Sequence, residues 1–141
     1  MLNTVAYESA AGATPVLVAH GLFGSAKNWG AIAKRMSASR PVIAADMRNH
    51  GQSPWFDTHT YPEMAADLAE LTTRQTDVLG HSMGGKAAMM LALQYPQTVG
   101  KLVVADIAPV AYRHTQMPMI DAMQAIDLEN VDTRSDADRA L

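Results

Sequence analysis

Hydrophobic residues in this sequence gather into short runs, with segments of helical spacing between them. Runs of four or five residues that are largely apolar and bounded by turn residues are typical of strands buried on both faces of a sheet. We expect such strands at residues 16–19, 41–45, 77–80 and 101–105, and an antiparallel strand at residues 5–8.

The segments between these runs repeat their apolar residues at helical spacing. The first expected helix starts near residue 25 with Ser25 or Asn28 as its cap, and the second starts at a capping box of Thr60 and Glu63. The third covers residues 83–95 and ends before Pro96. The apolar faces of the first two helices comprise Trp29, Ile32, Ala33 and Met36, and then Met64, Leu68 and Leu71.

Strands that alternate with helices predict an α/β fold with a mostly parallel, doubly wound sheet. After Pro109 the pattern changes, because Met117, Ile120 and Met123 indicate a helix outside the sheet layer. Residues 135–141 have the pattern of a helix that has only begun, so we expect the sequence to stop inside an element.

Composition narrows the classes of function. The 141 residues are 48% hydrophobic and 18% charged, which is ordinary for a folded domain. A net charge of −3 offers no basic surface for nucleic acid, and the lack of cysteine excludes a disulfide or a thiolate nucleophile. The sequence carries no cofactor motif, metal-ligand cluster or signal peptide, and no apolar run near the roughly 20 residues of a membrane helix. We therefore expect a cytoplasmic protein without cofactor, metal, nucleic-acid or membrane partner.

Ser82 is the first candidate for chemistry. It lies between a strand and a helix, with Gly80 two positions before it and Gly84 two positions after it. This is the pattern of a nucleophile elbow, in which a strained turn raises the serine hydroxyl above the sheet and the flanking positions have room only for glycine. The alternative is a glycine-rich turn in which the serine merely caps the helix. The strand and helix on either side favour the nucleophile.

A serine nucleophile needs two backbone N–H donors to stabilise the oxyanion of its tetrahedral intermediate. The N–H of Met83 is the expected first donor. The loop after the first parallel strand is placed to give the second through Leu22, with Phe23 a weaker candidate. In that loop, His20 and Gly21 are expected to support the turn, and His20 is expected to form hydrogen bonds rather than transfer protons.

Four segments together resemble the α/β-hydrolase superfamily, and within it the small bacterial esterases of the YbfF type. They are HGLFG at residues 20–24, DMRNHGQS at 46–53, GHSMGGK at 80–86 and DIAPV at 106–110. The resemblance extends from about residue 16 to residue 110. It implies that residues 1–109 form the N-terminal part of the hydrolase core, that residues 110–141 begin a helical cap, and that the last strands are missing.

The resemblance implies a serine esterase that acts on short to medium acyl chains through an acyl-enzyme, with a small-molecule ester as substrate. It assigns the acid to Asp106, which also ends a parallel strand at the edge of the sheet where ligands collect. The alternative is an aspartate that only caps or turns the chain before residues 107–109. It treats Asp46, Arg48 and His50 as a supporting loop. A thioesterase, a C–C hydrolase, a haloperoxidase or a non-catalytic binding fragment stays open, because the elbow alone does not choose the substrate.

The catalytic base is the missing part of this prediction. Among the five histidines only His114 follows the serine, and His81, although adjacent, is expected to point away from the hydroxyl. We expect the 141 residues to be a portion of a larger hydrolase that is inactive alone and associates through its exposed sheet edge or with the missing C-terminal part.

Met117, Met119 and Met123 either line an acyl pocket or fill a core, and core filling is the simpler expectation.

Overall fold

The computed structural model describes residues 1–72, 75–113 and 115–141. It divides into two compact units, Met1–Pro109 and Val110–Leu141, which are described separately here. His114, the only histidine that follows Ser82, lies outside the described residues. None of the described helices is both long enough and apolar enough to cross a membrane.

The first unit is built on a five-stranded sheet with the order β1-β3-β2-β4-β5. Its strands are Thr4–Tyr7, Val16–Ala19, Val42–Ala45, Thr76–His81 and Val99–Ala105. The pairings β2–β3, β2–β4 and β4–β5 are parallel, while β1 runs antiparallel beside β3. The mostly parallel α/β sheet expected from the hydrophobic runs is therefore confirmed.

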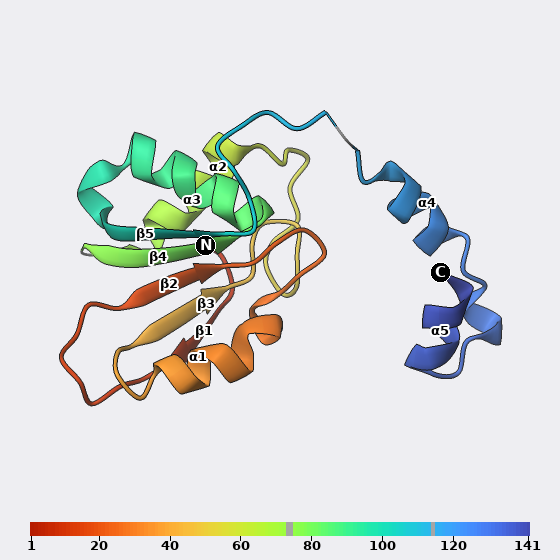
Figure 1. Cartoon of the computed structure of the whole chain (residues 1–141), viewed down its shortest axis with the longest axis horizontal. Coiled ribbons are helices and arrows are strands. Elements are labelled where there is room, and N and C mark those ends of the chain that lie inside the picture. Colours follow the sequence, from red (N-terminus) through yellow and green to blue (C-terminus); the bar gives the residue numbers. More distant parts are fainter. Residues whose placement is uncertain (73–74, 114) are drawn as a thin grey trace. The chain divides into compact units, whose positions relative to one another are not determined.

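Helices cover both faces of this sheet, with α1 on one face and α2 and α3 on the other (Figure 1). They span Gly30–Met36, Tyr61–Glu70 and Met83–Gln94, and the short 3₁₀ turn η1, Ala26–Trp29, leads into α1. Neighbouring residues of one strand point to opposite faces, so Leu17 packs in the core beneath α2 and α3 while Val18 packs in the core beneath α1.

The helix starts follow the sequence signals. Thr60 and Glu63 form the capping box of α2, in which the Thr60 N–H donates to Glu63 at 3.1 Å. Ser25 occupies the N-cap of η1, and its N–H donates to the Asn28 side chain at 2.7 Å, so the two residues that were alternatives act together.

Two expectations of burial are wrong. Ile32 was placed on the apolar face of the first helix, yet it is 49% exposed, since Ala33 rather than Ile32 faces the sheet. Strand β5 was expected to be buried on both faces, yet Val103 is 54% exposed and Leu102 is also exposed. The reason is position, because β5 is the outermost strand and has a neighbour on one side only, which confirms the exposed sheet edge expected where the last strands are missing.

The second unit consists of α4 at Met117–Gln124, the turn η3 at Leu128–Asn130, and α5 at Arg134–Ala140. None of its described residues is buried. The expectation that its methionines fill a core is therefore wrong, and Met117 and Met119 are half-exposed. Met119 and Met123 instead line a cavity of about 480 Å³ within this unit.

Candidate active site

Four sequence motifs meet at the carboxyl edge of the sheet. His20 follows β2, Asp46 follows β3, and Asp106 follows β5, while Ser82 stands between β4 and α3. In parallel sheets this edge is where ligands bind, because the loops that leave the strands converge there. The fold therefore brings together segments that are up to 86 residues apart in the sequence, from residue 20 to residue 106.

The backbone at Ser82 adopts a strained conformation, with φ of 51° and ψ of −118°. A side chain rarely takes this conformation, and such strain concentrates at functional positions. The Ser82 N–H donates to the Ala105 carbonyl at 3.0 Å, which ties the turn to the end of β5. Ser82 itself is half-buried.

Close backbone approach explains the glycines on either side of the serine. A Cβ on Gly80 would lie 2.7 Å from the Gly84 carbonyl carbon, and a Cβ on Gly84 would lie 2.6 Å from the Ala19 carbonyl carbon. Both separations are far shorter than real Cβ contacts. The first turn of α3 is therefore pressed against β2 and β4, which fixes the direction of the serine.

Asp106 directly follows β5 and also has a positive φ, of 56°. Its side chain is 86% exposed, and its Oδ2 lies 3.7 Å from Nε2 of His81. The His81 ring also packs edge-on against Trp29, with 6.2 Å between ring centroids. His81 is thus oriented toward the carboxylate and the indole, and most of the carboxylate surface is open to a further partner.

The candidate oxyanion donors differ in whether their N–H groups already form a hydrogen bond within the protein. The Phe23 N–H donates to Nε2 of His50 at 3.3 Å. For Leu22 and Met83, no hydrogen bond of the N–H to another described residue is recorded. A Cβ on Gly21 would lie 3.2 Å from Cβ of Ser82, so the loop passes directly over the serine.

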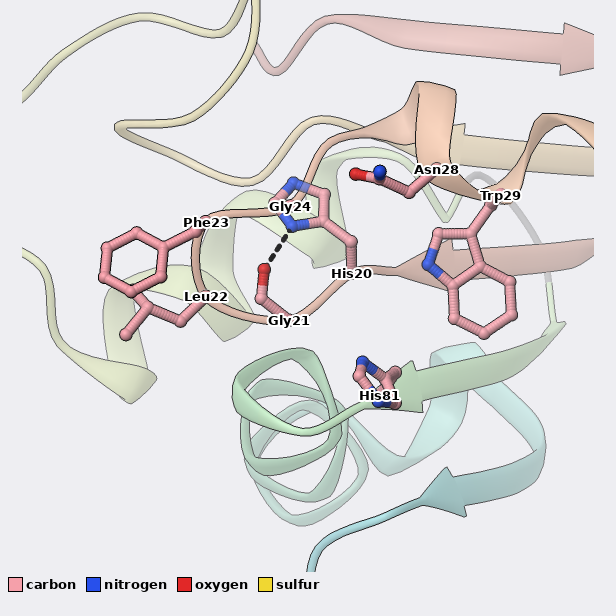
Figure 2. A pocket seen from close by; sticks show the side chains of 8 residues that line it. All are labelled: His20, Gly21, Leu22, Phe23, Gly24, Asn28, Trp29 and His81. Carbon is pink, nitrogen blue, oxygen red and sulfur yellow. Dashed lines mark hydrogen bonds between the residues drawn. The ribbon is translucent and has the colours of Figure 1, made fainter. Parts of the chain in front are cut away.

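A cavity of about 200 Å³ lies beside this loop. Figure 2 shows His20, Trp29 and His81 around it, while the side chains of Leu22 and Phe23 point together away from Trp29. The lining of the cavity includes two glycines of the loop and the aromatic residues His20, Phe23, Trp29 and His81. A pocket of this kind suits a small apolar group, and His81, the neighbour of Ser82 in the sequence, is part of its wall.

His20 is fully buried and uses both ring nitrogens. Its Nε2 accepts from the Met47 N–H at 3.0 Å, and its Nδ1–H donates to the Gly21 carbonyl at 2.7 Å, the bond drawn in Figure 2. Burial lowers the pKa of His20 below the usual histidine value and outweighs the opposite effect of the bond to Gly21. His20 is therefore held neutral as a support for the loop.

The loop after β3 is braced by buried charge. Arg48 forms a two-pronged ion pair with Asp67 of α2, at 2.6 Å from Nε and 3.1 Å from Nη2. Asp46 accepts from the Ala26 N–H at 2.7 Å, the Asn3 side chain at 2.8 Å and the Gln52 N–H at 2.9 Å. The loop is thus tied to α2, to η1 and to the N-terminus.

Replacing Asp46 with alanine is expected to cost about 3 kcal/mol of folding stability at pH 7, because three donors lose a charged acceptor. Burial alone would raise the pKa of Asp46, but its hydrogen bonds hold the pKa below the usual value of 3.8. The difference between variant and wild type should therefore persist above pH 3.8 and shrink as the pH falls through the lowered pKa. Urea unfolding at several pH values measures it, with the exposed Asp57→Ala as control; an equal loss in both variants would contradict the account.

Two features of the site had no signal in the sequence. The contact between Phe23 and His50 joins loops 27 residues apart, and the Trp29 ring was assigned to the core although it also lines the cavity. Neither follows from local spacing.

The sequence profile of the alpha/beta hydrolase fold matches residues 14–139, and the chain belongs to this family. A five-stranded, mostly parallel sheet with a strained serine after its fourth strand agrees with that membership.

Individual relatives are similar over most of the chain. An sn-1-specific diacylglycerol lipase ABHD11 of Xenopus tropicalis is 42% identical, over 94% of this chain and 44% of its own length. Esterase YbfF of Escherichia coli is 41% identical, over 88% of this chain and 51% of its own length. A solved structure of a marine microorganism esterase has a TM-score of 0.88 at 36% identity and covers 99% of this chain and 57% of its own. The chain thus spans about half the length of the curated relatives it matches.

Proposed function

We propose that the protein hydrolyses carboxylic esters of short to medium acyl chains through an acyl-enzyme on Ser82. The observation that carries this proposal is the positive φ of Ser82 at the junction of β4 and α3, with glycine packed tightly on either side. Backbone strain of this kind is concentrated at functional sites. In a nucleophile elbow the strained turn exposes the serine hydroxyl at the edge of the sheet. Relatives named esterase and lipase support the same class of reaction.

In the proposed reaction, Oγ of Ser82 attacks the ester carbonyl while a base takes its proton. The N–H groups of Met83 and Leu22 stabilise the resulting oxyanion, since neither donates to another described group. The intermediate collapses, the base returns the proton to the leaving alcohol, and water then hydrolyses the acyl-enzyme by the same steps. Asp106 is assigned the role of orienting the base.

We assign the base to none of the five histidines of this chain, but to a histidine in the part of the relatives' length that this chain does not span. His20 and His50 both use their two ring nitrogens for backbone partners, so neither is free to take a proton from Ser82. The open surface of Asp106 leaves room for an imidazole to dock beside the serine.

The 141-residue chain alone is therefore expected to have very little esterase activity, while a form extended to the length of its relatives should hydrolyse p-nitrophenyl butyrate. General-base catalysis typically contributes roughly 10²- to 10⁴-fold, and the two forms should differ by about that factor. The measurement is release of p-nitrophenol by each purified form, with its mass verified. Strong turnover by the verified 141-residue chain would contradict the assignment of the base, and no turnover by either form on esters of two to eight carbons would contradict the function. A thioester of the same acyl chain tests the neighbouring activity.

A further inference from the structure

Two histidines join the loops on either side of the proposed oxyanion hole, and they do so reciprocally. His20, in the loop after β2, accepts the N–H of Met47 from the loop after β3 at 3.0 Å. His50, in the loop after β3, accepts the N–H of Phe23 from the loop after β2 at 3.3 Å. The two rings meet edge to face, with 5.1 Å between centroids. We call this arrangement of His20, Met47, His50 and Phe23 the histidine clasp.

The partners of each ring fix its tautomer. A backbone N–H can only donate, so Nε2 of His20 and Nε2 of His50 must both be unprotonated acceptors. The other nitrogen of each ring faces a carbonyl: Nδ1 of His20 lies 2.7 Å from the Gly21 oxygen, and Nδ1 of His50 lies 2.9 Å from the Arg48 oxygen. Both rings are therefore neutral with the proton on Nδ1.

The clasp determines which N–H of the loop is available. Phe23 has a positive φ of 61°, and its N–H is occupied by His50. Leu22 comes one residue earlier and directly follows Gly21, where a Cβ would lie 3.2 Å from Cβ of Ser82. The Leu22 N–H donates to no described residue. With the Phe23 N–H bound to His50, the Leu22 N–H is the neighbouring donor of this loop that has no partner among the described residues.

On the basis of the proposed function, we propose that His20 and His50 act as a pair of positioning residues that aim the Leu22 N–H at the oxyanion of the Ser82 intermediate. The pair holds the loop only while both rings are neutral. Adding a proton to Nε2 of His50 places a donor against the Phe23 donor, so the bond is lost and the loop is released.

Several titratable and charged groups face the clasp from the elements packed against it. His59 lies next to His50 with 5.5 Å between ring centroids, and burial, followed by the charges of His50 and Arg48, lowers its pKa. Asp46 acts in the opposite direction on His20 but is outweighed there by burial. Glu63 and Asp67 both pair with Arg48, which limits the charge that Arg48 presents to His50.

Three variants separate the clasp from neighbouring effects. His50→Phe keeps a ring but removes the acceptor for Phe23. His50→Gln keeps an acceptor and removes the ionisation. His59→Gln removes the adjacent ionisable ring and keeps all four residues of the clasp, so it is the matched control.

The first test is nuclear magnetic resonance on the 141-residue chain, and it does not depend on catalysis. Long-range proton–nitrogen spectra should show both rings as Nδ1–H tautomers at pH 8, and the Phe23 and Met47 amide signals should move together when acid protonates His50. The His59→Gln variant should keep this transition and His50→Gln should lose it. An Nε2–H tautomer of His50 would overturn the clasp. So would a Phe23 amide chemical shift that stays constant while His50 is protonated.

The second test uses the ester-hydrolysing form. His50→Phe should lower kcat by roughly 10- to 100-fold with KM within about twofold, as expected when a transition-state donor is misplaced. His50→Gln, which keeps an acceptor for the Phe23 N–H, should retain more of kcat than His50→Phe. A His50→Phe variant with unchanged kcat, or equal losses in both His50 variants, would overturn the positioning role. If no form hydrolyses esters, the proposed function fails, while the spectra still decide the clasp.

Discussion

Replacing Ser82 with alanine is expected to lower kcat of the ester-hydrolysing form by roughly 10⁴- to 10⁶-fold, the size of effect that loss of a serine nucleophile has in other hydrolases. The physical reason is that no acyl-enzyme forms without the hydroxyl, and only the oxyanion donors and binding remain. The fold should be unaffected, because the strained backbone at Ser82 is held by Gly80, Gly84 and the bond to Ala105.

The measurement is the rate of p-nitrophenyl butyrate hydrolysis, with circular dichroism as a check on folding. Ser39→Ala is the matched control, because Ser39 is exposed at the end of α1 and its hydroxyl donates only to the Met36 carbonyl. A Ser82→Ala variant that retains more than about a tenth of the activity would show that another residue attacks the ester.

Replacing Gly84 with alanine is expected to destabilise the first unit by about 3 kcal/mol, and valine at the same position should prevent folding. A Cβ there would lie 2.6 Å from the Ala19 carbonyl carbon and 2.5 Å from the His20 carbonyl oxygen. Both neighbours are backbone atoms in the middle of the sheet edge, so they cannot move aside as a flexible side chain would.

Urea unfolding measures this loss, with Gly12→Ala as the control, since a Cβ on Gly12 would meet nothing within 4 Å. The control should stay within about 0.5 kcal/mol of the wild type. A Gly84→Ala variant as stable as the Gly12→Ala control would mean that α3 does not press against β2, and the geometry that aims Ser82 would then be wrong.

Much of the first unit could be predicted from the sequence because its elements depend on local patterns. The apolar runs predicted the strands, and the Thr60–Glu63 pair predicted the start of α2. The spacing of Gly80 and Gly84 around Ser82 predicted a cramped turn, because only glycine fits where the backbone leaves no room for a side chain.

What could not be predicted depends on where each element lies in the assembled fold. The apolar run at residues 101–105 by itself predicts a strand buried on both faces, and the exposed edge at β5 followed only from the expectation that the last strands are missing. The histidine clasp depends on two loops that meet only after the sheet has formed, so its pairs are 27 residues apart. Likewise, the methionines of α4 look like core residues, but their unit buries none of its described side chains.

The most direct test of the account is to locate the residue that a fluorophosphonate modifies. This reagent forms a stable covalent adduct with an activated serine that faces an oxyanion hole, and so reports the nucleophile and its donors together. Peptide mass spectrometry of the labelled ester-hydrolysing form is predicted to place one adduct on Ser82, with none after the Ser82→Ala substitution. An adduct on another residue, or ester hydrolysis that continues while Ser82 stays unmodified, would contradict the central claim.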